Sequence, residues 1–562
     1  MPMEKKSPIY TILVGGAAGD GAKEAAINFG RLAAKHGYEF FLSVEYPSLI
    51  RGGHNYARVS ISSKKVFCDS AELDAVVALN DETVEKHRSE IKKGGMIFLD
   101  SAEDAGKKGL INIPASAWVK EENLPRLFRA SALLGAVCRY YNFDIVELNN
   151  IFKEIFGEKA GPNILLAKKG YEFLQSKNVQ QVFLPRRKCA GKMVLDGNEA
   201  FSEGLVKAGL KNYFGYPMTP SSSILHYLAK KAKEYKLKVV QPENEISVIN
   251  MALGASYAGS RTAIASTGGG FALMLEAMAF AGVAEIPIVV VDAQRASTST
   301  GVPTRTGQGD LDFVRHLPGE YPRIVLAPGD ADEAYLIAGA AMNLAWKFQS
   351  PAVVLLDKHL SESVSTVDLQ TNKVKIENPK IAGNGAAYRR YAFSPDGVSA
   401  LAFPGEKGKV VKISSYEHDE DGYICDGVEN AKKMCEKRFA KTKGIVVERK
   451  KYDSIKIYGD KKAKNAVIFW GSVKGPMLEA MRAVKRPYKA VQIVWLEPFD
   501  TDRFLKEIKG VKKLVIAENN FTGQLAKLIR EKTGVEIKNK ILKYDSLPFD
   551  VRELAKKLDK IF

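Results

Sequence analysis

The amino-acid sequence predicts an α/β protein of several domains, and three observations support this. Short apolar runs such as YTILVGG, DAVVALN and GGMIFLD alternate with helix-like segments along the whole chain. The chain has 562 residues, which at roughly 100–200 residues per domain corresponds to about three to five domains. Hydrophobic residues make up 46% of the chain and charged residues 26%, as is usual for globular proteins with large cores.

The first α/β region is expected to cover residues 1–183. It opens with a strand, a glycine turn and a helix in YTILVGGAAGDGAKEAAINFG, but these glycines lack the G-x-G-x-x-G spacing of a dinucleotide-binding turn. NAD is therefore not expected there. The basic segment LPRRKCAGK (184–192) contains proline and glycine, and it is interpreted as a linker.

Two further α/β regions are expected after the linker. Residues 193–370 are predicted to form a doubly wound domain, with strands at 239–241, 262–267, 287–294, 323–328 and 351–357. Glycine and charged residues dominate 371–454, which is predicted to be an irregular connection. Residues 455–562 contain NAVIFWGS, KAVQIVWLEP and KKLVIAEN, which predict the strands of a last domain.

The cysteines and histidines exclude several kinds of site. The five cysteines are Cys68, Cys138, Cys189, Cys425 and Cys435, and none belongs to a C-x-x-C pair. The chain alone is therefore not expected to hold an iron–sulfur cluster, nor to be a secreted disulfide scaffold. The seven histidines show no metal-ligand spacing. These features favour a reducing cytoplasm and no metal site in this chain.

The net charge of +18 leaves two interpretations open. A dense basic patch between Lys432 and Lys464 could steer an acidic partner, or it could be a solvated lysine-rich surface. No nucleic-acid motif accompanies it, so nucleic acid is not expected. No stretch of about 18 apolar residues lacks charge or glycine, so no membrane span is expected. The first apolar run is interpreted as a strand, not as a signal peptide.

The segment GYPMTPSSSILHYLAKKAKEY (215–235) predicts a helix start. Thr219 is placed to cap the helix, Pro220 suits its first position, and Ser221 and Ser222 fill its first turn. Helix initiation alone would explain these residues. A helix N-terminus with hydroxyls and free amides can also bind a carboxylate or a phosphate.

The YPMTPSS stretch also resembles the Y-P-(I/M)-T-P-(S/A)-(S/T) signature of the α subunits of 2-oxoacid:ferredoxin oxidoreductases. Three further blocks follow in that family's order, namely QPENEISVINMALGASYAGSRTAIASTGGGFALM, DAQRASTSTGVPTRTGQGDL and AENNFTGQLAKLIR. The first 180 residues or so resemble the γ subunit, which some members fuse in front of α. The resemblance implies a γ-type domain, then a thiamine-diphosphate-binding (pyrimidine-type) doubly wound domain, then a transketolase C-terminal-like domain.

The resemblance implies the oxidative decarboxylation of a 2-oxo acid on thiamine diphosphate, with coenzyme A as acyl acceptor and ferredoxin as electron acceptor. In the family a separate β subunit carries the diphosphate, Mg²⁺ and 4Fe–4S sites. This chain fits that division, because it lacks cluster cysteines and the G-D-G…N-N diphosphate motif; the triplet Gly19–Gly21 has no Asn partner. Activity is therefore expected only with a β subunit. A thiamine enzyme without a redox partner and a non-catalytic assembly subunit are the alternatives.

Thiamine chemistry needs a carboxylate against the aminopyrimidine ring nitrogen. The PENE segment offers Glu243 and Glu245. Glu245 is preferred, since it directly precedes the small-residue helix ISVINMALGASYAG, as the family's glutamate does. Glu245 could instead be only a helix-start acid that complements the helix dipole.

A 2-oxo acid carries a carboxylate that a guanidinium can bind at two points. Arg295 follows the predicted strand PIVVVDAQ, at the strand end where ligands bind in parallel sheets, and the family places its substrate arginine there. Arg305 is the lesser alternative. Thr219 would add a hydroxyl, and the resemblance assigns Tyr216 and Pro217 of the same signature to this site.

Two glycine-rich segments complete the predicted sites. Gly268, Gly269 and Gly270 follow a strand and would let the backbone approach the cofactor closely, although a tight strand–helix turn alone would also need them. The γ-type R-G-G loop consists of Arg51, Gly52 and Gly53 and is followed by His54. A coenzyme A path and a subunit interface are both open for this loop.

The substrate stays open in the sequence. Where the family usually has G-(G/P)-P-S-T-G after its arginine, this chain has Ala296–Gly301, and the family's T-E-Q becomes Thr306–Gln308. These changes lie beside the expected pocket. We favour 2-oxoglutarate for a γ–α fusion, with pyruvate and branched-chain 2-oxo acids as alternatives.

Overall fold

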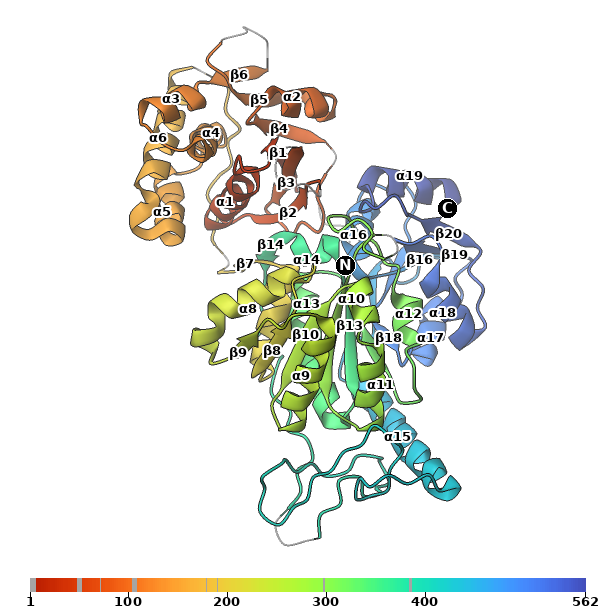
Figure 1. The fold of residues 1–562 in the computed structure, drawn as a ribbon. Helices are drawn as coiled ribbons and strands as arrows, with labels where there is room; N and C mark the ends of the chain where they lie inside the picture. The colour runs from red at the N-terminus through yellow and green to blue at the C-terminus, as the bar shows by residue number, and fades with distance from the viewer. Residues whose placement is uncertain are drawn as a thin grey trace. The chain divides into compact units, whose positions relative to one another are not determined.

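The computed structural model describes residues 7–47, 53–70, 72–103, 109–177, 179–189, 191–296, 299–383 and 387–562. The chain divides into two compact units (Figure 1). Unit 1 comprises Met1–Leu195, Glu362–Asp368 and Asp550–Glu553, and unit 2 comprises Asp196–Ser361, Leu369–Phe549 and Leu554–Phe562. The predicted α/β class is confirmed, while the finer division into a linker and three domains stays a prediction.

Unit 1 is built on an eight-stranded mixed sheet in the order β6-β5-β4-β1-β3-β2-β14-β7. Its strands are β1 (Tyr10–Ala17), β2 (Glu39–Glu45), β3 (His54–Ser62), β4 (Leu73–Ala78), β5 (Ile91–Asp100), β6 (Leu110–Ile113), β7 (Met193–Asp196) and β14 (Val364–Val367). The central strand β1 pairs parallel with β4 and antiparallel with β3. The late strand β14 extends the sheet by pairing antiparallel with β2.

The helices of unit 1 are α1 (Ala22–Lys35), α2 (Asp81–His87), α3 (Ala115–Glu121), α4 (Arg129–Tyr140), α5 (Ile145–Phe156) and α6 (Gly161–Ser176). Glycine lets α4 and α6 approach closely. A Cβ at Gly135 would overlap the carbonyl oxygen of Ala167, and a Cβ at Gly170 would overlap that of Ala132. Side chains at these two positions would therefore force the helices apart.

The segment expected to be a linker lies against unit 1. The Tyr38 hydroxyl donates to the Pro185 carbonyl over 2.9 Å, and the Arg187 amide donates to the His36 carbonyl over 2.9 Å. Residues 179–189 form neither helix nor strand. The backbone contacts tie this irregular segment to unit 1 itself.

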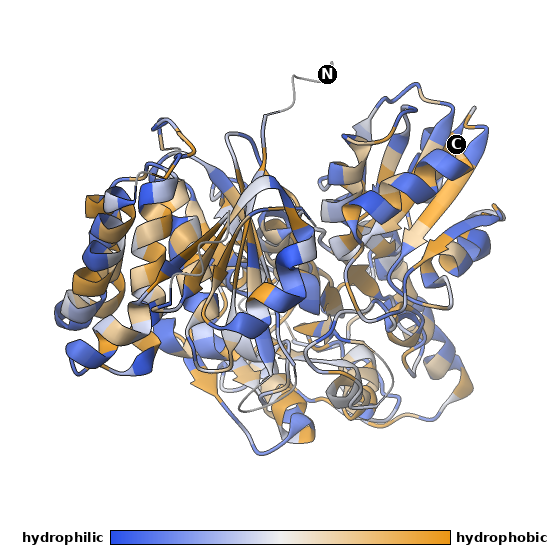
Figure 2. Ribbon diagram, turned by 90° about the horizontal axis from the view of Figure 1, so that it is seen from above, coloured by the Kyte–Doolittle hydropathy of each residue, from blue (hydrophilic) through white to orange (hydrophobic). Residues whose placement is uncertain are grey.

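Unit 2 contains a seven-stranded sheet in the order β18-β12-β13-β11-β10-β8-β9, with every neighbouring pair parallel except β12 and β18. Its strands are β8 (Asn212–Gly215), β9 (Lys238–Val240), β10 (Thr262–Ser266), β11 (Ile288–Gln294), β12 (Ile324–Leu326), β13 (Pro351–Asp357) and β18 (Trp495–Glu497). Every residue of β10, β11 and β13 is buried. Elsewhere too the strands that can be seen in Figure 2 are largely hydrophobic, whereas the helices carry both kinds of residue. This pattern fits a parallel sheet that is covered on both faces.

The helices around this sheet are α7 (Gly197–Lys207), α8 (Ser222–Tyr235), α9 (Glu245–Tyr257), α10 (Gly268–Ala272), α11 (Leu275–Val283), α12 (Leu311–Arg315), α13 (Ala331–Phe348) and α14 (Lys358–Glu362). Helix α13 packs closely on α7, where a Cβ at Gly204 would lie 2.8 Å from the Ala338 Cβ. Within the described ranges, no helix is both long and apolar enough to cross a membrane.

A second, five-stranded sheet completes unit 2, in the order β15-β17-β16-β19-β20. Its strands are β15 (Ile455–Gly459), β16 (Asn465–Trp470), β17 (Lys489–Ile493), β19 (Lys513–Glu518) and β20 (Asn539–Leu542). Its helices are α16 (Lys474–Met481), α17 (Thr501–Ile508), α18 (Gln524–Thr533) and α19 (Val551–Ile561). Strand β18 follows β17 along the chain and pairs with β12, so the chain itself links the two sheets.

The connection expected to be irregular ends in a long helix, α15 (Val428–Arg449), of 22 residues. Its buried face includes Lys437 and Lys441, which form ion pairs with the buried Glu285. Part of the basic patch is therefore internal, and neither interpretation of it as a surface applies to these lysines. An apolar repeat could not reveal a helix whose buried positions are partly cationic.

Candidate functional site

The carboxyl ends of the parallel strands of unit 2 meet at one edge of the seven-stranded sheet. Neighbouring strands in the order β11-β10-β8-β9 are followed along the chain by Arg295, Gly268, Tyr216 and Glu245, respectively. The predicted site residues of unit 2 therefore share one edge, which is where ligands bind in open α/β sheets. Helix α10 begins at this edge (Figure 1).

Glu245 is the first residue of α9, and the preceding Asn244 caps that helix by accepting a 2.9 Å hydrogen bond from the Ser247 amide. The Glu245 side chain is buried, and its Oε1 atom meets no hydrogen-bond donor among the described residues. Gly270 lies against it, since a Cβ there would be 2.6 Å from Oε1. Buried carboxylate oxygens are normally hydrogen-bonded, so this one is available to a ligand.

Glu243 differs from Glu245 both in burial and in hydrogen bonding. It is exposed, and its carboxylate accepts a hydrogen bond from the Ser247 hydroxyl, which lowers its pKa. This arrangement gives Glu243 a local structural partner. The geometry favours Glu245 as the carboxylate that would meet a cofactor.

Arg295 and Thr219 are brought together. The Arg295 Nη1 donates to the Thr219 carbonyl over 2.9 Å, and Arg295 Nε is buried without an acceptor among the described residues. Burial lowers the pKa of Arg295, and the charge of Asp310 opposes that shift. The half-buried guanidinium thus keeps an N–H group for an anionic ligand.

The predicted capping role of Thr219 is wrong. Helix α8 begins at Ser222 with Ser221 at the N-cap, and the Ser221 hydroxyl donates to the Met218 carbonyl over 2.7 Å. Residues 219–221 form a turn before the helix starts, and the peptide between Thr219 and Pro220 is cis. Pro220 and Ser221 therefore separate Thr219 from the first residue of the helix.

The first two residues of the signature are exposed. Tyr216 is 36% exposed and Pro217 is also exposed. Arg305 is the lesser candidate for binding the substrate carboxylate. Its backbone carbonyl accepts a 3.1 Å hydrogen bond from the Ala296 amide, which closes the loop between these two residues. Ser297 and Thr298, where the sequence departs from the family, lie outside the described residues.

Each glycine of the predicted cofactor turn faces a different element. A Cβ at Gly268 would lie 3.2 Å from Asp310 Oδ2, and a Cβ at Gly269 would lie 3.5 Å from the Ser299 carbonyl. The third glycine, Gly270, faces Glu245. The preceding Thr267 is buried, and its hydroxyl meets no partner among the described residues. This turn combines close backbone approach with a free hydroxyl.

The chain also brings a carboxyl pair to this edge that sequence reasoning missed. Asp292 in β11 is fully buried, and burial, followed by the charge of the nearby Asp310, raises its pKa well above its ordinary value. The available signal was an aspartate inside the apolar run IVVVDAQ, since an acidic residue is rarely buried without a partner. The partner could not be identified from the sequence, because the loop between the two residues brings Asp310 back to the strand.

The fourth sequence block packs against the loop that follows Arg295. The Gln308 amide donates to the Asn519 carbonyl over 2.7 Å, and the Asn519 amide donates to Gln308 Oε1 over 3.0 Å. The Gln308 side chain also donates to the Trp470 carbonyl over 3.1 Å. The five-stranded sheet therefore supports the loop beside the site.

In unit 1, Arg51 and Gly52 lie outside the described residues. Gly53 has a φ of 73°, and His54 begins β3. His54 Nε2 lies 2.8 Å from His87 Nε2, and burial and then the charge of His87 lower the pKa of His54 to about 4. His54 is therefore neutral at pH 7. The coenzyme A path and the subunit interface both stay predictions for this loop.

Asp20, between the two glycines of the Gly19–Gly21 triplet, has a structural role. Its carboxylate accepts the Ala17 amide over 2.9 Å and pairs with the buried Arg129 over 2.5 Å. Arg129 also pairs with Asp100 over 3.0 Å. This ion network occupies the aspartate that a diphosphate-binding metal would need.

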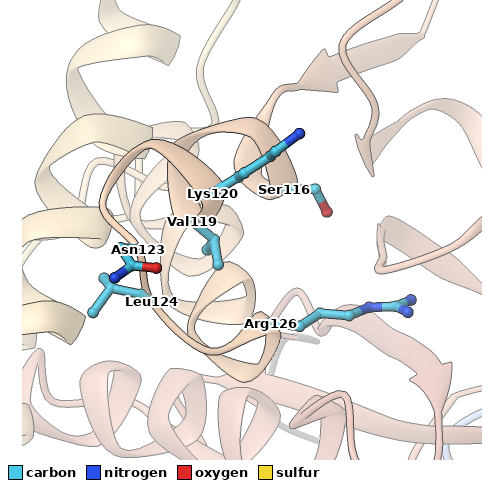
Figure 3. A pocket seen from close by; sticks show the side chains of 6 residues that line it. All are labelled: Ser116, Val119, Lys120, Asn123, Leu124 and Arg126. Carbon is cyan, nitrogen blue, oxygen red and sulfur yellow. The ribbon is translucent and has the colours of Figure 1, made fainter.

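Unit 1 also carries a shallow hollow of about 350 Å³ beside α3 (Figure 3). It is lined by Ser116, Val119, Lys120, Asn123, Leu124 and Arg126. Figure 3 shows Ser116, Lys120 and Arg126 directed to one side. The hollow has no carboxylate or imidazole in its lining, so it does not offer the acid–base groups found at the edge of the seven-stranded sheet.

Comparisons with known proteins agree with the sequence blocks. Residues 203–437 match the family model described as "Pyruvate flavodoxin/ferredoxin oxidoreductase, thiamine diP-bdg". Residues 11–173 match the model described as "Pyruvate ferredoxin/flavodoxin oxidoreductase". Both matched segments carry blocks that first indicated the resemblance.

Relatives and a solved structure match over almost the whole length. A 2-oxoacid:ferredoxin oxidoreductase subunit alpha from Sulfolobus sp is 32% identical, covering 98% of this chain and 96% of the relative. The 2-oxoglutarate oxidoreductase subunit KorA of Mycobacterium tuberculosis is 26% identical, with coverages of 99% and 92%. The structure of 2-oxoglutarate:ferredoxin oxidoreductase from Magnetococcus marinus, with 2-oxoglutarate, coenzyme A and succinyl-CoA bound, has a TM-score of 0.90 at 28% identity, covering 99% of this chain and 100% of that chain. This chain belongs to the family of 2-oxoacid:ferredoxin oxidoreductase alpha subunits.

Proposed function

We propose that this chain is the catalytic γ–α subunit of an enzyme that oxidatively decarboxylates 2-oxoglutarate. The substrate would lose carbon dioxide, its acyl group would pass to coenzyme A, and two electrons would pass singly to ferredoxin. One observation carries the proposal. The unpaired, buried Glu245 Oε1 belongs to the same sheet edge as the contact between Arg295 and Thr219.

Glu245 has the surroundings that the thiamine ring requires. Thiamine diphosphate, when bound, would supply the carbon nucleophile for the decarboxylation. The Glu245 carboxylate would accept a hydrogen bond at Oε1 from the pyrimidine ring nitrogen, with Gly270 leaving room beside it. A buried acceptor without a donor costs about 1–3 kcal/mol, so keeping Glu245 unpaired favours a catalytic subunit over an assembly subunit.

Arg295 would hold the carboxylate of the 2-oxo acid. Its unpaired Nε and its guanidinium plane allow two-point binding, and its contact with the Thr219 carbonyl fixes its orientation. The Thr219 hydroxyl would add a donor to the same carboxylate. Tyr216 and Pro217, both exposed, would line the entrance to this site.

Three exposed apolar residues near Glu245 and the glycine turn support the need for a β subunit. Ile246 is 52% exposed, Met251 on the same helix is 45% exposed, and Leu273 after α10 is 55% exposed. Ile246 and Met251 lie on the helix that begins with Glu245, and Leu273 follows the glycine turn. Large apolar residues exposed beside a ligand site can contribute to a protein interface. We propose that the β subunit covers these residues and supplies the diphosphate, Mg²⁺ and 4Fe–4S sites, for which this sequence has no motif.

The choice of substrate rests on the relatives. KorA of Mycobacterium tuberculosis is named for 2-oxoglutarate, and the Magnetococcus marinus structure holds that acid and coenzyme A. The Gly53–His54 segment of the γ-type domain is our proposal for the coenzyme A path. Pyruvate and branched-chain 2-oxo acids are the alternatives, because the loop after Arg295 departs from the family pattern.

The test is to purify this chain alone and together with its β subunit, and to measure ferredoxin reduction that depends on a 2-oxo acid and coenzyme A. The lone chain should bind thiamine diphosphate weakly and show no activity, whereas the complex should be active and should prefer 2-oxoglutarate. Tight, Mg²⁺-dependent binding of thiamine diphosphate by the lone chain would contradict the shared site. A preference for pyruvate would contradict the proposed substrate but not the proposed reaction or the shared site.

A further inference from the structure

Three consecutive residues, Thr306, Gly307 and Gln308, lie in the loop between the end of β11 and the start of α12. All three are buried, although they belong to no helix or strand. Loops normally run over the surface, because a buried loop must find partners for its backbone polar groups. For this tripeptide the partners come from elements around both sheets of unit 2.

Gln308 attaches one end of the tripeptide to the five-stranded sheet. Its backbone amide donates to the Asn519 carbonyl over 2.7 Å, and its side chain accepts from the Asn519 amide over 3.0 Å. The side chain also donates to the Trp470 carbonyl over 3.1 Å. Trp470 ends β16, and Asn519 directly follows the neighbouring strand β19. Because the Gln308 side chain is fully buried, these hydrogen bonds fix its position.

Thr306 attaches the other end to the seven-stranded sheet. Its hydroxyl donates to Asp357 Oδ1 over 3.4 Å and accepts from the His359 amide over 3.2 Å. Asp357 is the last residue of β13, so this contact lies at the carboxyl edge of that sheet. The Thr306 amide donates to the Ser546 carbonyl over 3.2 Å, in the segment after β20. The tripeptide is therefore held at both ends.

Gly307, between these two attachments, lies against the backbone at Arg295. A Cβ at Gly307 would be 3.2 Å from the Ala296 Cα and 3.4 Å from the Arg295 carbonyl oxygen. The Ala296 amide also donates to the Arg305 carbonyl over 3.1 Å, just before the tripeptide. The backbone of Arg295 is thus packed against the tripeptide, while its Nη1 donates to the Thr219 carbonyl over 2.9 Å.

We propose that Thr306, Gly307 and Gln308 are positioning residues for Arg295. The outer two hold the loop to the two sheets, and Gly307 supports the peptide that follows Arg295. This inference rests on the proposed function, because it takes Arg295 as the cation that binds the substrate carboxylate. Two-point binding depends on the position of the guanidinium as well as on its charge. Since a misplacement of about 1 Å can cost roughly a hundredfold, smaller shifts of Arg295 should raise the KM for the 2-oxo acid by about three- to thirtyfold.

The first test adds one methyl group beside Arg295. The φ of Gly307 lies outside the left-handed region, so alanine is allowed there, but its Cβ would press on Ala296. In the complex with the β subunit, Gly307→Ala should raise the KM for 2-oxoglutarate. The affinity for thiamine diphosphate and the exchange rate of the thiazolium proton should stay at the wild-type values.

Gly309→Ala is the matched control, because a Cβ at Gly309 would meet no atom within 4 Å. This variant should keep the wild-type KM. An unchanged KM in Gly307→Ala would overturn the proposal, and so would an equal rise in Gly309→Ala.

The second test releases the tripeptide from the five-stranded sheet. Gln308→Ala removes the side-chain hydrogen bonds to Asn519 and Trp470, so it should also raise the KM for 2-oxoglutarate. Gln492→Ala is its control, since Gln492 is equally buried in the same sheet and donates to Glu333 over 2.7 Å. A purely structural role would lower the stability of both variants and leave both KM values unchanged, and that result would overturn the proposal.

A double-mutant cycle tests whether Gln308 acts through Arg295. In Arg295→Lys the two-point geometry is already lost, so Gln308→Ala should raise the KM by a smaller factor there than in the wild type. Equal factors in both backgrounds would overturn the positioning role. If Gln308→Ala fails to fold, Thr306→Val replaces it in both experiments, and Thr306→Ser, which keeps the hydroxyl, should restore the wild-type KM.

Hydrogen exchange of the full chain gives a measurement that does not depend on turnover. The Ala296 and Asn519 amides should exchange faster in Gln308→Ala than in the wild type, because both donate hydrogen bonds within the held loop. Unchanged exchange would overturn the proposed attachment. If exchange rises but the wild-type complex turns over no 2-oxo acid, the proposed function fails and the attachment stands. If the complex turns over 2-oxoglutarate with the same KM in Gly307→Ala, the proposed function stands and the positioning role fails.

Discussion

Glu245 and Glu285 are both buried glutamates at the rim of the seven-stranded sheet, but at opposite edges. At the carboxyl edge, Glu245 follows β9 and keeps an oxygen that no described donor contacts. At the amino edge, Glu285 precedes β11 and pairs with Lys437 over 2.7 Å and with Lys441 over 2.5 Å. Unpaired buried groups cost stability, so the carboxyl edge is arranged for a ligand and the amino edge for the fold.

The amino edge also fixes the connection that ends in α15. Arg390, within that connection, donates to the Glu285 carbonyl over 2.8 Å and to Gln349 Oε1 over 2.8 Å. Burial alone would raise the pKa of Glu285, but Lys441, Lys437 and Arg390 hold it well below its ordinary value. The cations therefore tie α15 to the starts of β11 and β13. The carboxyl edge has no comparable ion cluster around Glu245 among the described residues.

The largest expected effect is that of Glu245→Gln on activity. A neutral amide can touch the ring nitrogen but stabilises the imino form poorly, so carbanion formation should slow by roughly a hundred- to ten-thousand-fold. Exchange of the thiazolium proton with deuterium, followed by NMR after acid quenching, measures this step. The free energy of unfolding should hardly change, because no described donor is lost.

Glu243→Gln is the control for that experiment. Glu243 is exposed and bonded to the Ser247 hydroxyl, so its neutral variant should exchange the thiazolium proton at the wild-type rate. An unchanged rate in Glu245→Gln, combined with a slow rate in Glu243→Gln, would exchange the roles of the two residues.

Glu285→Gln should lower the stability of the fold and leave the thiamine chemistry unchanged, the reverse of the effect of Glu245→Gln. Removing the one carboxylate leaves buried lysines without a counter-charge, which should lower the free energy of unfolding by about 3–5 kcal/mol. Urea denaturation of the full chain measures this loss. Thiazolium proton exchange in the folded complex should stay at the wild-type rate, because Glu285 belongs to the other edge of the sheet.

The matched control is Glu276→Gln on α11, an exposed glutamate in the same part of the chain. Its effect on the free energy of unfolding should stay within about 0.5 kcal/mol. An equally small loss in Glu285→Gln would show that the ion cluster contributes little and would remove the contrast between the two edges.

The same comparison explains which parts of the fold the sequence could predict. Strand β13 was predicted at 351–357, and the structure has it at Pro351–Asp357, because a strand buried on both faces is a continuous apolar run. Helix α15 was not predicted, because Lys437 and Lys441 occupy buried positions. Residue type signals burial only when the buried group is apolar.

The site was predictable to a similar degree. Glu245 and Arg295 could be found because each follows a recognisable strand, and parallel strands bring their carboxyl ends together. Thr219 was wrongly expected to cap α8, because the local pattern does not show where the chain turns. The proximity of Asp310 to Asp292 depends on the path of a loop, which has no sequence signature.

Arg295→Lys should affect substrate binding at the carboxyl edge without affecting cofactor binding there. Lysine keeps the charge but loses two-point geometry, so the complex should lose about 2 kcal/mol of substrate affinity, near the lower end of the range for a truncated charge pair. The KM for 2-oxoglutarate should rise, while the affinity for thiamine diphosphate stays level. Arg305→Lys is the control, and a larger effect there would make Arg305 the substrate arginine.

The smallest expected effect concerns Lys441 and the pH dependence of stability. Burial lowers the pKa of Lys441 to about 8, although the charge of Glu285 opposes this shift. The unfolded chain therefore binds more protons than the folded chain between about pH 8 and the unfolded value of about 10.4. The free energy of unfolding should consequently rise with pH in that window, by at most about 1.4 kcal/mol per pH unit, and this contribution should be lost as the pH falls through 8.

Lys441→Gln should remove this slope and keep a donor for the Gln349 carbonyl, which Lys441 contacts over 3.1 Å. Urea denaturation of the full chain at about pH 8 and about pH 9 would measure the slope. Lys443→Gln, on the exposed side of α15, should keep the wild-type slope. Equal slopes in the wild type and Lys441→Gln would mean that Lys441 stays charged throughout. Glu285 would then be held by a permanently charged cluster, and the amino edge would be insensitive to pH in this range.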